Sequence, residues 1–239
     1  MIKFINVNKY FDKFHVLKEI NLHFEEGNII ALIGPNACGK TTLIKNLLGM
    51  VVPSSGEIQF LNHSIEKDWK YRNHIGYMPQ IGRYPENMTV GQVLGMIEDL
   101  RDKDSVELDR ELYDKYELKD ILNKRMGTLS GGTRQKVSAY LAFLFSPKVL
   151  VLDEPTAGLD PLSSLILKEK ISKEKSKGKL ILITSHILSE LDSIVNQVVY
   201  MEEGEIIFNK SLDQLKADTD KTNLSEAIAH IMINKNLMN

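Results

Sequence analysis

Residues 29–50 place an apolar run, a glycine-containing loop and a helical stretch directly one after another. The apolar run, residues 29–33, has no polar interruption, which is typical of a strand buried on both faces of a sheet. Two more such runs follow at residues 149–152 and 180–184, and a helical stretch at residues 162–177 separates them. This alternation predicts an α/β fold with a mainly parallel sheet and helices on its faces.

Further strands are expected outside this alternation. Residues 2–7 and 19–24 predict two strands with turn chemistry between them, which indicates an antiparallel β part at the N-terminus. Residues 58–61 and 75–78 predict two more strands. These segments add to the mainly parallel sheet and do not change the fold class.

Residues 85–145 break the alternation and predict an inserted helical subdomain. Thr89 and Gln92 form a capping-box pair, and apolar residues then recur at helical spacing. We therefore expect a single domain over residues 1–239, with a core at residues 1–84 and 146–215, the helical subdomain at residues 85–145 and a short C-terminal tail at residues 216–239.

The composition excludes several classes of protein. Hydrophobic residues make up 43% of the chain, which is too many for an intrinsically disordered protein. The net charge of −2 lacks the basic excess of a nonspecific nucleic-acid binder, and a single cysteine cannot form an internal disulfide. No signal-peptide pattern is present, and the longest apolar stretches are far shorter than the ~20 residues that span a bilayer. We expect a cytoplasmic chain that binds no nucleic acid and could still dock on a membrane protein.

The loop at residues 34–41 fits the pattern G-x-x-x-x-G-K-[ST] and predicts phosphate binding. Small residues let successive backbone N–H groups turn inward around phosphate oxygens, and the following helix points its positive end at the same oxygens. Lys40 is expected to reach the β- and γ-phosphates, and Thr41 to offer a hydroxyl to Mg²⁺. A chance glycine turn is disfavoured, because a buried strand precedes the loop and a helix follows it. The candidate nucleotide-binding residues here are Gly34, Pro35, Asn36, Ala37, Cys38, Gly39, Lys40, Thr41 and Thr42.

Two carboxylates, Asp153 and Glu154, end the apolar run at residues 149–152. Ligands of open α/β sheets lie beyond the carboxyl ends of the strands. Asp153 is therefore expected to face Mg²⁺, directly or through water, and Glu154 to polarise the attacking water of a phosphoryl transfer. Adjacent acids after a strand can also simply cap the next turn, but the phosphate loop favours the catalytic interpretation.

Besides these two sites, the chain has a third motif. The segment Leu129-Ser130-Gly131-Gly132-Thr133-Arg134-Gln135 resembles the signature motif of the ATP-binding-cassette (ABC) ATPases. This motif separates that family from other proteins with a phosphate loop. The resemblance covers nearly the whole chain, from about residue 2 to residue 215, and further motifs stand in the family's order.

Four more residues match family positions. Phe11 resembles the aromatic residue that stacks on adenine, with Tyr10 as the alternative, and Gln80 resembles the glutamine that links the metal site to the helical subdomain. Asp160 ends a segment similar to the loop that crosses to the partner subunit, and His186 resembles the histidine that contacts the γ-phosphate. Each residue alone could be structural, but the motifs in register favour the family.

The resemblance implies an ATPase that converts ATP and water to ADP and phosphate with Mg²⁺. The implied catalytic residues are Glu154, His186, Lys40 and Gln80, and the implied metal residues are Thr41, Gln80 and Asp153. Besides the phosphate loop, the implied nucleotide-binding residues are Phe11, Ser130, Gly131, Gly132 and Asp160.

The resemblance also implies partners. In the family, Ser130, Gly131 and Gly132 meet the γ-phosphate held by the other subunit of a head-to-tail dimer. We therefore expect a homodimer, or a pair with a similar ATPase, which ATP closes and hydrolysis loosens. Multi-span transmembrane subunits are the implied further partners and would hold the chain at the inner face of the cell membrane. The loop at residues 81–88 combines Gly and Pro with Ile81, Tyr84 and Met88, and is the expected contact with them.

Two departures from the family pattern bear on the site. The loop has Ala37 and Cys38 where Gly and Ala are usual, so Ala37 is strained if its position needs a positive φ. Cys38 lies next to a helix N-terminus and Lys40, which favours a thiolate, but we expect it to serve simply as a small side chain. Thr133 replaces a commoner Gln, and we expect its side chain to cap the helix that begins there.

ABC-type proteins also have functions other than membrane transport. ABC proteins that act on DNA carry a long coiled coil, but only about 90 residues separate Lys40 from Ser130 and no sustained heptads occur. Ribosome-associated ABC factors resemble two cassettes on one chain with a basic linker, whereas this chain has one cassette. A soluble ATP switch without a membrane partner stays open. The chain as a whole is also similar to the ATPase of the transporter linked to maturation of nitrous-oxide reductase.

Overall fold

The computed structural model describes residues 1–100 and 108–238. The chain forms two compact units, one of Met1–Arg72 with Leu180–Asn239 and one of Asn73–Lys179. Residues 101–107 of the expected helical subdomain and residue 239 of the expected tail lie outside the described residues. The division into core, helical subdomain and tail stays a prediction.

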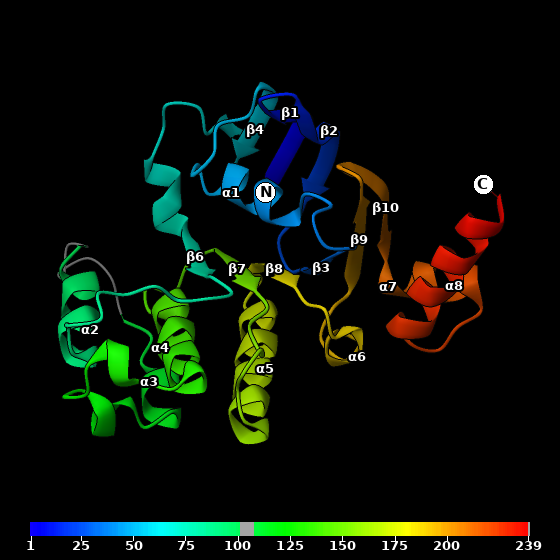
Figure 1. Cartoon of the computed structure of the whole chain (residues 1–239). Coiled ribbons are helices and arrows are strands. Elements are labelled where there is room, and N and C mark those ends of the chain that lie inside the picture. Colours follow the sequence, from blue (N-terminus) through cyan, green and yellow to red (C-terminus); the bar gives the residue numbers. More distant parts are fainter. Residues whose placement is uncertain (101–107, 239) are drawn as a thin grey trace. The chain divides into compact units, whose positions relative to one another are not determined.

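The first unit contains an antiparallel sheet, as the N-terminal segments predict. Its strands lie in the order β2-β1-β4-β5, and each pair of neighbours is antiparallel (Figure 1). The rings of Phe4 and Phe24 meet edge to face in its core, with centroids 6.0 Å apart. The strands are β1 (Ile2–Phe11), β2 (Phe14–Phe24), β4 (Ser55–Phe60) and β5 (His63–Ser64).

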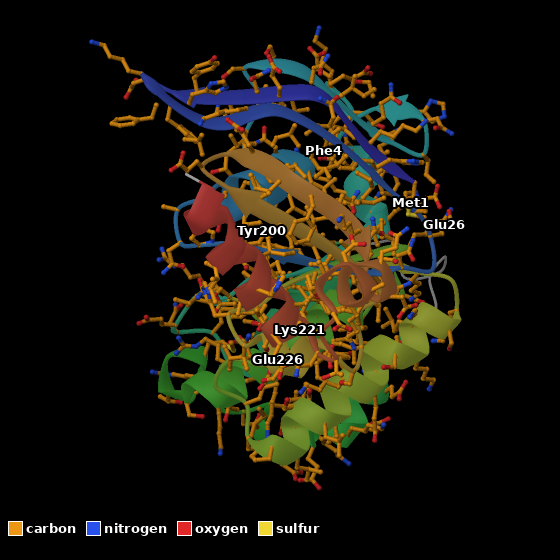
Figure 2. All side chains as sticks on the ribbon, turned by 90° about the vertical axis from the view of Figure 1, so that its right-hand side faces the viewer. Met1, Phe4, Glu26, Tyr200, Lys221 and Glu226 are labelled. Carbon is orange, nitrogen blue, oxygen red and sulfur yellow. The ribbon has the colours of Figure 1, made fainter. Side chains whose placement is uncertain are left out.

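Four more strands of the first unit lie in the order β10-β9-β3-β8. Strand β3 (Ile29–Ile33) is parallel to both of its neighbours, β8 (Leu180–Thr184) and β9 (Gln197–Glu202). All residues of β3 and β8 are buried, as their apolar runs predict. Neither β9 nor the antiparallel edge strand β10 (Glu205–Ser211) is predicted from the sequence. Figure 2 labels Tyr200, which lies on β9.

The helices of the first unit include a C-terminal pair. Ser211 and Gln214 form a capping box that begins α7, and the backbone N–H of Leu224 donates to Asp192 at the start of α8. Lys221 and Glu226, labelled in Figure 2, flank this second helix start. The helices are α1 (Lys40–Leu47), α6 (Leu188–Leu191), α7 (Leu212–Thr219) and α8 (Leu224–Met238), and a 3₁₀ helix, η1 (Lys70–His74), spans the boundary between the units.

The second unit combines two parallel strands with helices (Figure 1). The predicted capping box is confirmed, because Thr89 accepts from the N–H of Gln92 and Gln92 accepts from that of Thr89. The strands are β6 (Ile75–Met78) and β7 (Val149–Asp153). The helices are α2 (Val90–Asp99), α3 (Glu111–Lys115), α4 (Gly131–Phe143) and α5 (Pro161–Ser176), with the 3₁₀ helices η2 (Leu118–Ile121) and η3 (Met126–Thr128).

The two units together bear out the predicted fold class, a mixed α/β protein with an antiparallel N-terminal sheet and mostly parallel strands elsewhere. Within the described ranges, no helix has both the length and the apolar character needed to cross a membrane.

Candidate active site

The loop between β3 and α1 turns through positive φ three times, at Gly34 (151°), Ala37 (63°) and Gly39 (111°). A Cβ on Gly34 would lie 2.0 Å from the carbonyl oxygen of Met201, so only glycine fits there. Gly39 is the N-cap of α1 and makes no side-chain capping hydrogen bond to the first turn of this helix. The cradle therefore fits phosphate oxygens, because helix N-termini and consecutive loop amides bind anions.

Lys40 lies over this loop. Its Nζ donates to the carbonyl oxygens of Gly34 at 2.8 Å and of Pro35 at 2.9 Å. The buried Sγ of Cys38 lies 3.7 Å from the same amine. The lysine charge is therefore held at the cradle, where a polyphosphate would meet it.

Ala37 confirms one expectation about the loop. Its φ of 63° shows that the position needs a left-handed backbone, which costs an alanine more than a glycine. Cys38 is 3% exposed, and its carbonyl oxygen accepts from the N–H of Gly204.

His186 borders the same loop from within the first unit. A cavity of about 170 Å³ is lined by Gly34 and Pro35 on one side and by Ser185 and His186 on another. The Oγ of Ser185 accepts from the N–H of Ile187 at 3.0 Å, which shapes the turn that carries His186 beyond β8. Side chains of α8 also line this cavity, a contact that the sequence analysis does not predict.

Two aromatic side chains end β1, and both are exposed. The ring of Tyr10 stacks on His15, with centroids 4.0 Å apart and planes 13° apart. The ring of Phe11 instead has Lys9 Nζ 4.9 Å from its centroid. Because Tyr10 is already stacked within its own unit, Phe11 stays the preferred candidate for adenine.

The paired acids end β7 in the second unit. Asp153 is its last residue, and Glu154 follows with a φ of 49°, a left-handed backbone that is rare for glutamate. Met78, the last residue of the parallel strand β6, pairs with Leu152, so Gln80 leaves the sheet at the same edge as the two acids. Burial and the charge of Asp153 raise the pKa of Tyr77, on β6.

The signature residues begin α4. Ser130 is the N-cap, and its Oγ accepts from the N–H of Thr133 at 3.2 Å. The expectation that Thr133 caps this helix is wrong, because Thr133 already lies in the first helical turn, where its hydroxyl bonds to that of Ser130 at 2.9 Å. A Cβ on Gly131 would have no described atom within 4 Å, so this end of the helix is open on that side.

Asp160 begins α5. Its carboxylate accepts from the N–H of Ser163 at 2.9 Å and from the hydroxyl of Ser163 at 2.7 Å, and Lys136 Nζ lies 3.0 Å away. The hydrogen bonds from Ser163 and then that from Lys136 hold the pKa of Asp160 well below its usual range. Lys136 carries no role in the sequence analysis, although its place six residues after Ser130 puts it on the signature helix.

The proposed metal residues fit Mg²⁺ by donor chemistry. Thr41 offers a hydroxyl, Asp153 a carboxylate and Gln80 an amide carbonyl, and Mg²⁺ prefers such oxygen donors together with phosphate and water. Among the described residues, no cluster of three or more His, Cys, Asp or Glu could hold a metal ion unaided.

The comparison with known proteins gives one family. A family model described as ABC transporter matches residues 17–157, more than half of the chain. The lantibiotic transport ATP-binding protein SrtF of Streptococcus pyogenes is 34% identical over 89% of this chain and 92% of its own length. The ABC transporter ATP-binding protein NatA of Bacillus subtilis is 29% identical over 95% of this chain and 94% of its own.

Solved structures agree on the fold. One described as the ATP-binding subunit of an ABC transporter has a TM-score of 0.88 and 26% identity, and covers 97% of this chain and 99% of its own. A cassette in a dimeric post-hydrolysis state with ADP and Pi has a TM-score of 0.79 and 21% identity, and covers 89% of this chain and 99% of its own.

Proposed function

The chain belongs to the ABC transporter family as an ATP-binding subunit, and from this premise we propose that it binds ATP with Mg²⁺ and hydrolyses it to drive transport by membrane subunits. The observation that carries the proposal is the loop between β3 and α1. Its three positive-φ residues form an anion cradle, and Lys40 Nζ sits at that cradle. Phosphate binding follows from the loop amides, the end of α1 and the lysine charge.

Each unit has its own part in the proposed reaction. In the first, Lys40 and the loop bind the β- and γ-phosphates, Thr41 holds the metal, Phe11 stacks on adenine and His186 contacts the γ-phosphate. In the second, Asp153 and Gln80 hold the metal, and Glu154 accepts a proton from the attacking water. When bound, Mg²⁺ would supply positive charge beside the phosphate oxygens, and the protein residues would supply the positioning.

The signature helix supports a dimer. Ser130 caps α4 with its side chain, and the residues that follow are two glycines, so the helix end admits an anion close to its backbone. We infer that this end meets the γ-phosphate of ATP bound to a second ATPase subunit. ATP would then join the two subunits and hydrolysis would release them.

Glu154→Gln tests the catalytic proposal. The variant keeps the shape of the side chain but loses the proton acceptor, so it should bind ATP normally, lose turnover and accumulate as a closed dimer with ATP and Mg²⁺. Light scattering on the ATP-bound variant gives the readout. A monomer with ATP shown to be bound would contradict the dimer proposal, and full turnover would contradict the role of Glu154.

Lys40→Ala is the matched control. It removes the cation that faces the phosphates, so it should lose nucleotide binding itself rather than hydrolysis alone. Equilibrium binding of a fluorescent ATP analogue separates the two variants.

A further proposal concerns the membrane partner and the cargo. We propose that multi-span membrane subunits hold this chain at the inner membrane face. On its similarity to the ATPase linked to nitrous-oxide reductase maturation, we propose that transporter as the specific system. Co-purification from the native membrane tests both. A multi-span protein in stoichiometric amount would support the transporter, whereas a chain that purifies alone and still hydrolyses ATP would favour a soluble switch.

A further inference from the structure

The first two turns of α4 touch the segment that follows β7, and both lie in the second unit. At Gly132 the backbones meet directly, because a Cβ there would lie 2.5 Å from the carbonyl oxygen of Gly158. Three residues further along the helix, Gln135 is 5% exposed and its Nε2 donates to the carbonyl oxygen of Glu154 at 3.4 Å. That carbonyl belongs to a residue whose φ is +49°, so the amide braces a backbone that glutamate rarely adopts.

Lys136, the next residue of α4, braces the other end of the same segment. Its Nζ lies 3.0 Å from Oδ2 of Asp160 and 5.7 Å from the centroid of the Tyr116 ring. The hydroxyl of Tyr116 donates to the carbonyl oxygen of Ser163 at 3.0 Å. The signature helix and the start of α5 are therefore tied by a chain of polar contacts that includes the cap of α5.

We propose that Gln135 and Lys136 are positioning residues for ATP hydrolysis, which fix residues 154–160 to the signature helix. The inference rests on the proposed function, in which Glu154 polarises the attacking water. When the start of α4 meets a phosphate and shifts, these contacts carry the backbone of Glu154 with it. In the proposed dimer, the start of α4 meets the nucleotide bound to the partner subunit. That nucleotide thereby positions Glu154, which acts on the nucleotide bound to its own subunit.

Steady-state kinetics of Lys136→Met and Gln135→Met test the inference. Each variant keeps an apolar stem of similar length but removes the charge or the donor. We expect kcat for ATP to fall about tenfold, because small displacements of catalytic groups cost this much or more, while KM and the melting temperature stay near wild type. Lys136→Arg should restore most of kcat, since it returns the cation to Asp160. Lys168→Met, on α5, controls for the loss of one positive charge.

The outcomes separate this inference from the proposed function. If the wild type does not hydrolyse ATP, or if Glu154→Gln is as active as the wild type, the proposed function fails. If the wild type is active and Glu154→Gln is not, unchanged kcat in both Met variants overturns the positioning role. A fall in kcat with an equal loss of thermal stability and no rescue by Lys136→Arg would also overturn it, because that result describes general structural damage.

Discussion

Two residues of the candidate site hold a left-handed backbone although neither is glycine. Ala37 has a φ of 63° in the phosphate loop, and Glu154 has a φ of 49° directly after β7. Such strain persists only where surrounding structure fixes it, and it concentrates at functional sites. Next to Ala37, the carbonyl oxygen of Cys38 accepts from the N–H of Gly204, and at Glu154 the hydrogen bond from Gln135 contributes.

Ala37→Gly should stabilise the protein. A left-handed alanine costs roughly 1–2 kcal/mol, and the greater entropy of glycine in the unfolded chain offsets roughly 0.4–1 kcal/mol of the relief. We expect the free energy of unfolding to rise by about 0.5–1 kcal/mol, measured by denaturant unfolding. Ala157→Gly, at an exposed alanine with no positive φ, is the control and should be neutral or destabilising. Equal effects at both positions would contradict the strain at Ala37.

At the scale of elements, the segment between β6 and α2 contains both a partly buried side chain and exposed side chains. Tyr84 is partly buried, and its hydroxyl shares a hydrogen bond of 2.9 Å with Oγ of Ser138, which is 1% exposed on α4. Burial raises the pKa of Tyr84, and the bond to Ser138 opposes that rise. Arg83 is exposed and Ile81 is 64% exposed. Tyr84 therefore packs under its own helices, and the expected contact with a membrane partner is better tested at Arg83.

Tyr84→Phe should destabilise the isolated chain by about 1 kcal/mol, because the buried hydroxyl of Ser138 loses its partner. Arg83→Glu should change the free energy of unfolding by less than about 0.5 kcal/mol, since it alters an exposed charge. A pull-down of the membrane subunit beside a melting curve gives both readouts. If the loop is the docking surface, Arg83→Glu weakens assembly without lowering the melting temperature, and intact assembly would remove this loop from the interface.

Local patterns predict elements in this chain better than they predict contacts between elements. The uninterrupted apolar runs predict β3 and β8 with their observed bounds, because burial on both faces leaves a clear signal. The hairpin of β9 and β10 escapes prediction, since β10 alternates exposed and half-buried residues and resembles a polar segment. The family resemblance implies roles for Ser130 and Glu154, which stay predictions. It does not indicate the contact of Gln135 with Glu154, because that contact depends on how α4 packs after β7.

At the scale of the whole molecule, a buried ion cluster links the helices of the second unit. Lys170 on α5 is 1% exposed, and its Nζ lies 2.5 Å from Asp109, 2.9 Å from Glu111 and 3.1 Å from Glu174. Glu174 is fully buried and also pairs with Lys177 and Lys179. Burial alone would raise the pKa of Glu174, but the lysine hydrogen bonds outweigh it and lower that pKa to about 2.

The lowered pKa makes stability depend on pH in a defined window. The ordinary pKa of a glutamate is 4.5, so well above pH 4.5 Glu174 is ionised in both states and the cluster contributes its full stability. Below pH 4.5 the unfolded state binds a proton that the folded state does not, and this contribution falls until the pH reaches about 2. Burial alone would lower the pKa of Lys170, but its hydrogen bonds to the carboxylates outweigh burial and raise that pKa. The contribution of Lys170 to folding stability is therefore lost only as the pH rises into the alkaline range.

Glu174→Gln isolates this contribution from the other carboxylates. The variant keeps the volume of the side chain but cannot ionise, so its deficit in unfolding free energy should be large at pH 6 and shrink by on the order of 3 kcal/mol on approach to pH 2. Denaturant unfolding of wild type and variant at several pH values measures the difference. Glu169→Gln is the matched control on the same helix, because Glu169 has a 58% exposed side chain and only a 3.5 Å pair with Lys115. Its deficit should stay within about 0.5 kcal/mol at every pH, as for exposed ion pairs. A Glu174→Gln deficit that does not change between pH 6 and pH 2 would show that the buried lysines do not hold Glu174 ionised, and that the cluster stabilises the fold by packing alone.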